Sequence, residues 1–116
     1  MKTPEPQPPT RIPDEATLRA ALEGPRFLLF KHSPICPISD RARRRYERFV
    51  TDHPDLPTAW VDVIEQRELA RGIVAEHGIR HESPQALLFS EGRCTWHASH
   101  DGIQEASLGD ALAALA

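Results

Sequence analysis

Residues 27–39 read FLLFKHSPICPIS and contain the most informative pattern in the chain. Residues 27–30 are a wholly apolar run of four, and Gly, Ser and Pro residues bound the run on both sides. A helix of that length could not propagate, so the run predicts a strand that is buried on both faces inside a sheet. Pro37 suits the first turn of a helix, because a proline there gives up only an amide that has no partner. This segment therefore predicts an interior strand that leads directly into a helix.

The elements predicted around this segment alternate strand and helix. The helix from residue 37 to about residue 50 is amphipathic, with an arginine-rich outer face and these apolar positions at helical spacing: Ile38, Ala42, Tyr46, Phe49 and Val50. We expect further strands at residues 58–63, 86–89 and 93–98, and further helices at residues 16–23, 66–77 and 103–116. Asp14 is expected to cap the first helix and Gly78 to end the third, while the turn at residues 90–92 makes a hairpin.

The order of these elements predicts an α/β fold. It is β-α-β-α-β-β-α, preceded by an extra N-terminal helix. A central mixed four-stranded sheet would consist of a parallel pair completed by the antiparallel hairpin, with helices on both faces.

Length, charge and hydropathy exclude several classes of protein. With 116 residues, 40% of them hydrophobic, the chain is sized for one domain with its own core. Fourteen Lys and Arg against seventeen Asp and Glu leave a net charge of -3, unlike the cationic field of a nucleic-acid-binding protein. No apolar run approaches the ~20 residues of a membrane span. The first residues lack a signal peptide, so we expect a cytoplasmic protein with no nucleic-acid or membrane partner.

The beginning of the chain is rich in proline. Five of the eleven prolines lie within residues 1–13, where they remove amide donors and favour extended, solvated conformers. We therefore expect a flexible tail at residues 1–13 and one domain at residues 14–116.

Cys36 is the candidate catalytic residue. It falls at the N-terminus of the predicted helix, where free amides and the positive end of the helix dipole stabilise a thiolate. Asp40 would oppose the thiolate at close range, whereas the arginines at positions 41 and 43–45 supply a positive field. Three residues after the thiol stands Ser39, which cannot form a disulfide, so a dithiol cycle within the motif is excluded.

Cys94 is the other thiol of the chain. It is expected to share a strand face with Trp96 and Ala98 and to be packed and inert. A role as resolving thiol is the alternative. We expect instead that any further thiol comes from another molecule.

Ser83 and Pro84 form the second candidate site. A proline just before a strand suits a cis peptide in a tight turn next to the thiol, with an ordinary trans-proline loop as the alternative. His32 and His81 are candidates for tuning the ionisation of Cys36, with surface or structural roles as alternatives. Cysteine and histidine at positions 94, 97 and 100 would face alternate sides of a strand, so we predict no metal site.

Taken together, these motifs resemble the YtxJ-like monothiol bacilliredoxins of the thioredoxin-like superfamily. The matching blocks are KHS at 31–33, CPIS at 36–39, HESPQA at 81–86 and WHASH at 96–100, within a similarity that covers about residues 14–115. The resemblance implies a thioredoxin-like fold with Pro84 in cis, Cys36 as the redox thiol and Ser39 in the place of a second cysteine. Pro34-Ile35 replaces the small polar residues more usual before the cysteine, which could alter the groove.

The same resemblance implies the substrates. These are proteins that carry a mixed disulfide with bacillithiol, the low-molecular-weight thiol that replaces glutathione in some bacteria. Bacillithiol would be the thiol co-substrate, and no cofactor would be tightly bound.

The expected activity is that of a monothiol, glutaredoxin-like thiol-disulfide oxidoreductase. Cys36 would take bacillithiol from a client protein and a second bacillithiol would release it, while Pro37, Ser39, Ser83 and Pro84 contact the substrate. The alternative is a non-catalytic thioredoxin-fold module that binds thiols or an iron-sulfur cluster, or that senses redox state.

Overall fold

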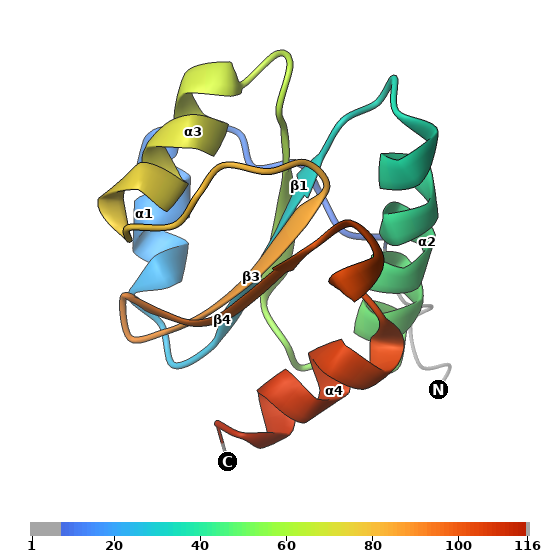
Figure 1. Ribbon diagram of the computed structural model, residues 1–116. Coiled ribbons are helices and arrows are strands. Elements are labelled where there is room, and N and C mark those ends of the chain that lie inside the picture. Colours follow the sequence, from blue (N-terminus) through green and yellow to red (C-terminus); the bar gives the residue numbers. More distant parts are fainter. Residues whose placement is uncertain (1–7, 116) are drawn as a thin grey trace, which may run out of the picture.

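The computed structural model describes residues 8–115. Their elements are α1 (Glu15–Leu22), β1 (Phe27–His32), α2 (Pro37–Thr51), β2 (Thr58–Asp62), α3 (Arg67–Glu76), β3 (Gln85–Ser90), β4 (Arg93–Ser99), the 3₁₀ turn η1 (His100–Gly102) and α4 (Glu105–Ala113). The described strands form one sheet in the order β2-β1-β3-β4 (Figure 1). β1 is parallel to β2 and antiparallel to β3, which is antiparallel to β4. The predicted mixed four-stranded α/β fold is confirmed.

β1 is an interior strand, and all six of its side chains are buried. Because successive side chains of a strand point to opposite faces, β1 contributes to two separate cores. Leu29 packs with α1 and α3 on one face of the sheet, whereas Leu28 and Phe30 pack with α2 and α4 on the other. Figure 1 shows these two pairs of helices on opposite sides of the sheet. The apolar run at residues 27–30 therefore fills both helix–sheet interfaces.

The inward face of α2 differs from the prediction at its first turn. The buried residues of the helix are Ser39, Ala42, Tyr46, Phe49 and Val50. The expectation that Ile38 points into the core is wrong, because its side chain is 47% exposed. Ser39 takes the inward position instead, since its hydroxyl has polar partners at the end of β1. Ile38 is consequently displayed at the surface, two residues after Cys36.

Two glycines stand where the backbone is left-handed. Gly78 has φ of 68° just after α3, and in the hairpin turn Glu91 and Gly92 have φ of 50° and 83°. Positive φ at both central residues is the type I′ geometry that joins two antiparallel strands. α4 begins at Glu105 instead of Ile103, because η1 and the buried Ile103 come first. No helix between residues 8 and 115 is both long and apolar enough to cross a lipid bilayer.

The segment before α1 corrects the expected tail. Ile12 is 4% exposed and packs in the core between the sheet, α1 and α3. Trp60 of β2 donates its backbone amide to the Thr10 carbonyl at 3.0 Å and accepts from the Ile12 amide at 2.8 Å. The prolines do not prevent this contact, because the donors belong to Ile12 and Trp60. Residues 10–12 therefore lie along β2 and belong to the domain, whereas residues 1–7 of the expected tail lie outside the described chain.

Candidate functional site

Cys36 lies where the sheet leads into α2. It is the N-cap residue of that helix, and Pro37 occupies the first helical position. The Cys36 turn (residues 33–36) is closed by a hydrogen bond from the Cys36 amide to the Ser33 carbonyl at 3.2 Å. The thiol is free and half-buried, and within residues 8–115 it makes no capping hydrogen bond. Cys36 therefore stands at the N-terminus of α2, where the free amides and the positive end of the helix dipole are located.

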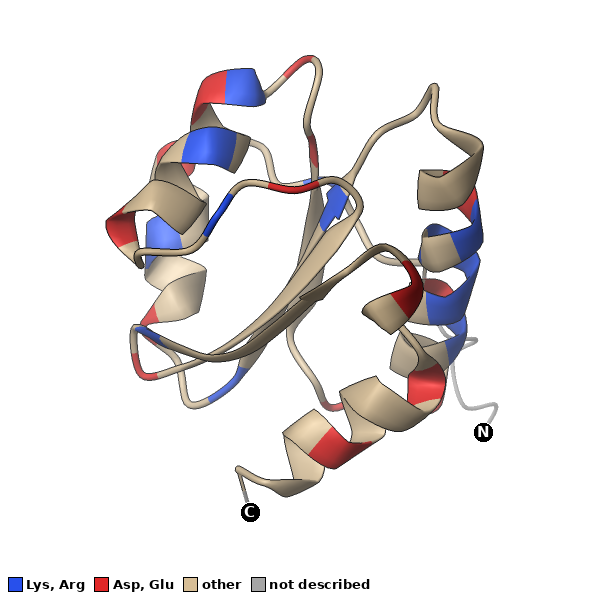
Figure 2. Cartoon of the chain, in the orientation of Figure 1, with Lys and Arg blue, Asp and Glu red and all other residues tan. Residues whose placement is uncertain are grey.

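Asp40 opposes the thiolate less than its position suggested. Its carboxylate pairs with Arg43 at 2.7 Å and with Arg44 at 3.2 Å. The hydrogen bond from Arg43 lowers the pKa of Asp40. Further arginines of α2 pair with acidic residues of η1 and α4, so the row of basic residues along this helix (Figure 2) is largely neutralised within the molecule. Most arginines of α2 are therefore engaged in ion pairs and do not form an open anion-binding surface.

Ser39 and His32 form a buried polar contact under the first turn of α2. The Ser39 hydroxyl lies 2.8 Å from His32 Nδ1 and accepts a hydrogen bond from the Ser33 amide, also at 2.8 Å. Burial, followed by the charge of Arg43, lowers the pKa of His32, which favours the neutral imidazole. Within the described chain, Ser39 and not Cys36 is the hydrogen-bond partner of His32. His32 therefore contacts the first turn of α2 through Ser39, and its role in tuning Cys36 stays a prediction.

The Pro84 loop (residues 80–84) lies at the same end of the sheet as the Cys36 turn. β1 and β3 are antiparallel and Lys31 pairs with Gln85, so the end of β1 lies beside the start of β3. The peptide bond between Ser83 and Pro84 is cis, and Pro84 is buried. The Ser83 hydroxyl is buried without a hydrogen-bond partner among the described residues. The topology thus brings together the two segments that the sequence singled out.

The last residue of β4, Ser99, and the residue after it, His100, hold this loop from the β4 side. The Pro84 carbonyl accepts a hydrogen bond from the His100 amide at 3.1 Å. Ser99 donates its hydroxyl hydrogen to the Glu82 carboxylate, and this bond lowers the pKa of Glu82. The loop is therefore tied to the strand at the edge of the sheet.

On the β1 side, the loop is held by Lys31, to which the sequence motifs assign no role. Lys31 is 0% exposed, and its amine lies 2.7 Å from His81 Nδ1 and 2.7 Å from Gln85 Oε1. His81 thus faces Lys31. Among residues 8–115 it makes no hydrogen bond to Cys36, so its predicted influence on the thiol stays a prediction. A lysine directly after the apolar run of residues 27–30 is the signal in the sequence.

Exposed apolar side chains border the thiol. Ile35 is 82% exposed and Ile38 is 47% exposed, on either side of Cys36. Ile64, 49% exposed, follows β2, whose end is paired with the end of β1. Ile35 and Ile38, unlike the core residues, are available to a partner that approaches Cys36.

Cys94 lies at the opposite end of the sheet from Cys36. It pairs with Phe89, which in turn pairs with Phe27 at the start of β1. β1 spans roughly 16 Å at ~3.3 Å per residue, whereas a disulfide needs Cα atoms within about 7 Å of each other. A disulfide between Cys36 and Cys94 is therefore incompatible with this fold.

The packing of Cys94 corrects one detail of the prediction. The pairing shifts between Leu88 and Phe89, so that Trp96 packs on the α2 side of the sheet and Cys94 on the α1 side. The expectation that Cys94 shares a face with Trp96 and Ala98 is wrong, because this β-bulge adds a residue between them. Burial raises the pKa of Cys94, consistent with a packed thiol.

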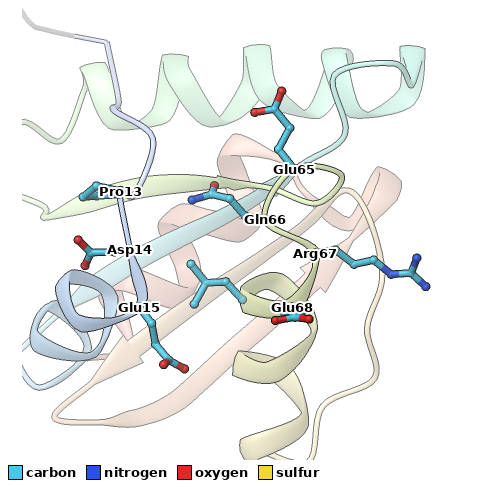
Figure 3. A pocket seen from close by; sticks show the side chains of 8 residues that line it. Pro13, Asp14, Glu15, Glu65, Gln66, Arg67 and Glu68 are labelled. Carbon is cyan, nitrogen blue, oxygen red and sulfur yellow. The ribbon is translucent and has the colours of Figure 1, made fainter.

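Two cavities of the molecule are alternative candidate sites to Cys36, and in the described part of the chain neither groups side chains for a metal ion. One of about 550 Å³ lies between the N-terminal ends of α1 and α3 and is lined by several carboxylates (Figure 3). Asp14 there caps α1, and Glu65 pairs with Arg11, so these carboxylates already have structural partners. A second cavity of about 390 Å³ adjoins the Cys36 turn at Pro34 and His32. Among residues 8–115, no three His, Cys, Asp or Glu side chains are grouped to hold a metal ion.

Comparison with known proteins places this geometry in a family. The family model described as "Monothiol bacilliredoxin BrxC" matches residues 11–108. A solved structure described as a candidate oxidoreductase with a thioredoxin fold is similar, with a TM-score of 0.84 and 28% sequence identity over 89% of this chain and 92% of that chain.

Two thioredoxins share the fold at lower identity. A thioredoxin variant from Halobacterium salinarum NRC-1 has a TM-score of 0.73 at 22% identity, over 98% of this chain and 96% of that chain. A thioredoxin from Trypanosoma brucei brucei has a TM-score of 0.75 at 15% identity, over 99% and 96%. These two matches support the fold alone.

Proposed function

The chain belongs to the monothiol bacilliredoxin family, and from this premise we propose that it removes bacillithiol from proteins that carry it in a mixed disulfide. The family and its thioredoxin-fold neighbours support thiol-disulfide oxidoreductase chemistry in general terms. One observation carries the proposal further: Cys36 caps α2 beside the Pro84 loop, and the residue three positions later is a serine with its own buried partners.

The reaction has two exchange steps. The Cys36 thiolate attacks the bacillithiol sulfur of the mixed disulfide, a new S–S bond forms, and the client cysteine leaves as a thiolate that takes a proton from solvent. The thiolate of a second bacillithiol then attacks the bacillithiol sulfur bonded to Cys36. Cys36 leaves as a thiolate, and bacillithiol disulfide is released. The two electrons that reduce the client come from oxidation of bacillithiol.

The position of Cys36 suits both steps. A helix N-terminus stabilises the thiolate, which makes Cys36 reactive in the first step and a good leaving group in the second. Ser39 cannot compete for the adduct as a second cysteine would, so release depends on an external thiol. Backbone groups of Ser83 beside Pro84 would orient the substrate in the manner of an added strand.

The test uses the two cysteines as a matched pair. Cys36→Ser should abolish removal of bacillithiol from a client protein, followed by intact-protein mass spectrometry. Cys94→Ser should retain nearly all of it, because Cys94 lies at the far end of the sheet. The wild type should gain one bacillithiol mass on Cys36 from bacillithiol disulfide and lose it to reduced bacillithiol.

Two results would contradict the proposal. Equal loss in both variants would mean that Cys36 is not the single redox thiol. A brown, iron-containing protein after purification without oxygen, with no bacillithiol adduct, would point to a cluster-binding module.

A further inference from the structure

Lysine is rare in this chain and one of its two copies is buried. Of the 14 Lys and Arg residues, only Lys2 and Lys31 are lysines. Lys31 stands on the central strand with 0% exposure. Arginine carries almost every other positive charge of the chain, so a lysine on the central strand is an exception. Lysine can lose its proton when buried, whereas arginine stays charged.

Lys31 contacts the Pro84 loop and the start of β3. Its Nζ lies 2.7 Å from His81 Nδ1 and donates to Gln85 Oε1 at 2.7 Å. Gln85 in turn donates through Nε2 to the Arg80 carbonyl at 3.0 Å. These contacts lie on both sides of Ser83 and Pro84 in the sequence. Lys31 therefore ties both ends of the loop to the strand that leads to Cys36.

The surroundings of Lys31 favour the uncharged amine. Arg71 of α3 repels a positive charge there, Glu82 of the loop attracts one, and the paired residue on β2 is the apolar Val61. In residues 8–115, no carboxylate forms an ion pair with Nζ. A buried ammonium without a carboxylate is costly, whereas a neutral amine keeps both contacts.

Ionisation follows from that environment. Burial, followed by the charge of Arg71, lowers the pKa of Lys31 to about 7. His81 is also surrounded by positive charge, because Lys31, Arg71 and Arg67 face it and only Glu82 opposes them. Burial and these charges lower the pKa of His81, which favours its neutral imidazole. The contact between Lys31 and His81 is therefore a hydrogen bond and not an ion pair.

We propose that Lys31 is a positioning residue of the Cys36 site, whose buried amine holds the Pro84 loop where the incoming disulfide binds. Ser99 and His100 hold the same loop from β4, and Lys31 supplies the anchor on the β1 side. The kinetic consequence rests on the proposed function. The ionic state of Lys31 and the rigidity of the loop do not, because both are measured without substrate.

The first experiment follows the lysine signals by NMR in wild-type protein labelled at lysine with ¹³C and ¹⁵N. The chain gives two lysine side-chain signals, and Lys31→Met assigns one of them. We expect the Lys31 signal to titrate near pH 7. Titration of both signals above pH 9 would overturn the proposal.

The second experiment measures amide hydrogen exchange of the loop at pH 8. Lys31→Met should speed exchange by about tenfold at the His100 amide, which donates to the Pro84 carbonyl, and at the Glu82 amide, which donates to Gln85 Oε1; this increase is the equivalent of losing one neutral hydrogen-bond anchor. Lys2→Met is the control and should leave both amides unchanged. Equal exchange in wild type and Lys31→Met would show that Lys31 does not hold the loop.

The third experiment separates binding from thiol reactivity. In Lys31→Met, the KM for a bacillithiolated client should rise about tenfold at an unchanged rate of Cys36 alkylation by iodoacetamide. Lys31→Arg should be worse, because its charge is permanent. The wild-type KM should fall as pH rises through 7, and that of Lys31→Met should stay flat. An arginine variant that works like wild type would overturn the proposal, whereas an inactive wild type whose Lys31 titrates near pH 7 and holds the loop would overturn only the proposed function.

Discussion

Ser39 occupies the place of a second thiol and has a structural task of its own. Its hydroxyl receives the Ser33 amide and contacts His32, which joins the end of β1 to the first turn of α2. These polar groups are buried, so each needs a partner. The residue that makes the site monothiol therefore also holds the helix whose N-terminus carries Cys36.

Replacing Ser39 by alanine should lower stability measurably. The substitution leaves the Ser33 amide and His32 Nδ1 without their partner, at a cost of about 1–3 kcal/mol in the free energy of unfolding. Urea unfolding followed by circular dichroism measures this cost. Ser90→Ala, at the end of β3, is the control and should change stability by less than about 0.5 kcal/mol. A Ser39→Ala protein as stable as wild type would show that the buried contact is dispensable.

Lys31 should give the stability of the protein a specific pH dependence. The pKa of Lys31 is about 7 in the folded chain, below the 10.5 of an unperturbed lysine. Between these values the unfolded state binds more protons, so stability rises with pH by at most about 1.4 kcal/mol per unit, and below pH 7 the gain is absent. Urea unfolding at pH 6, 7.5 and 9 should show this rise in wild type relative to Lys31→Met. Parallel pH profiles would contradict it.

At the scale of elements, the junction of β1 and α2 does two things at once. It places the thiol at the positive end of a helix, and it leaves the isoleucines on either side of the thiol exposed. Exposed apolar side chains around a reactive group are available for burial against a protein partner. If the proposed function holds, the junction offers a protein client an apolar contact that a small disulfide would use less.

Ile35→Ser should weaken the reaction with protein clients selectively. Losing the apolar contact of this 82% exposed side chain should raise the KM for a bacillithiolated protein by about five- to tenfold, because burying an isoleucine contributes about 1.5–3 kcal/mol when complete. The KM for bacillithiol disulfide should change less than twofold. Steady-state kinetics with both substrates measure this difference.

Ile64→Ser is the matched control. Ile64 is also exposed but follows β2 instead of preceding the thiol, so its loss should have little effect. Equal effects of both substitutions would mean that client proteins contact the whole end of the sheet.

At the scale of the molecule, the N-terminal segment completes the domain. Residues 10–12 lie along β2, which would otherwise present unpaired backbone groups at the edge of the sheet. The Arg11 guanidinium adds an ion pair to Glu65 at 2.7 Å. The match to the family begins at residue 11, which agrees with a domain that starts before α1.

Ile12→Ala tests this boundary. The side chain is buried against α1 and α3, so its truncation should cost about 2–5 kcal/mol of unfolding free energy. Ile35→Ala removes the same atoms from an exposed side chain and should cost less than about 0.5 kcal/mol. Thermal and urea unfolding provide the comparison. Equal stabilities of the two variants would mean that the segment around Ile12 is a loose tail and not part of the domain.

Much of the fold and the main site residue are predictable from the sequence because they depend on neighbours along the chain. The apolar run of β1, the cap at Asp14 and the left-handed turn at Gly92 are local signals, and each appears in the structure. Cys36 at the start of α2 belongs to the same class, since a strand, a turn and a proline follow one another within residues 27–37.

Other features depend on residues that only the folded chain brings together. Lys31 and His81 are 50 positions apart, and nothing in either local segment predicts their contact. The bulge that separates Cys94 from Trp96 and the burial of Ile12 against α1 and α3 likewise arise from pairing and packing between elements. Periodicity along the chain encodes which residues turn inward, whereas the partners they meet, and hence their charge state and exposure, are set by the packing of the elements against one another.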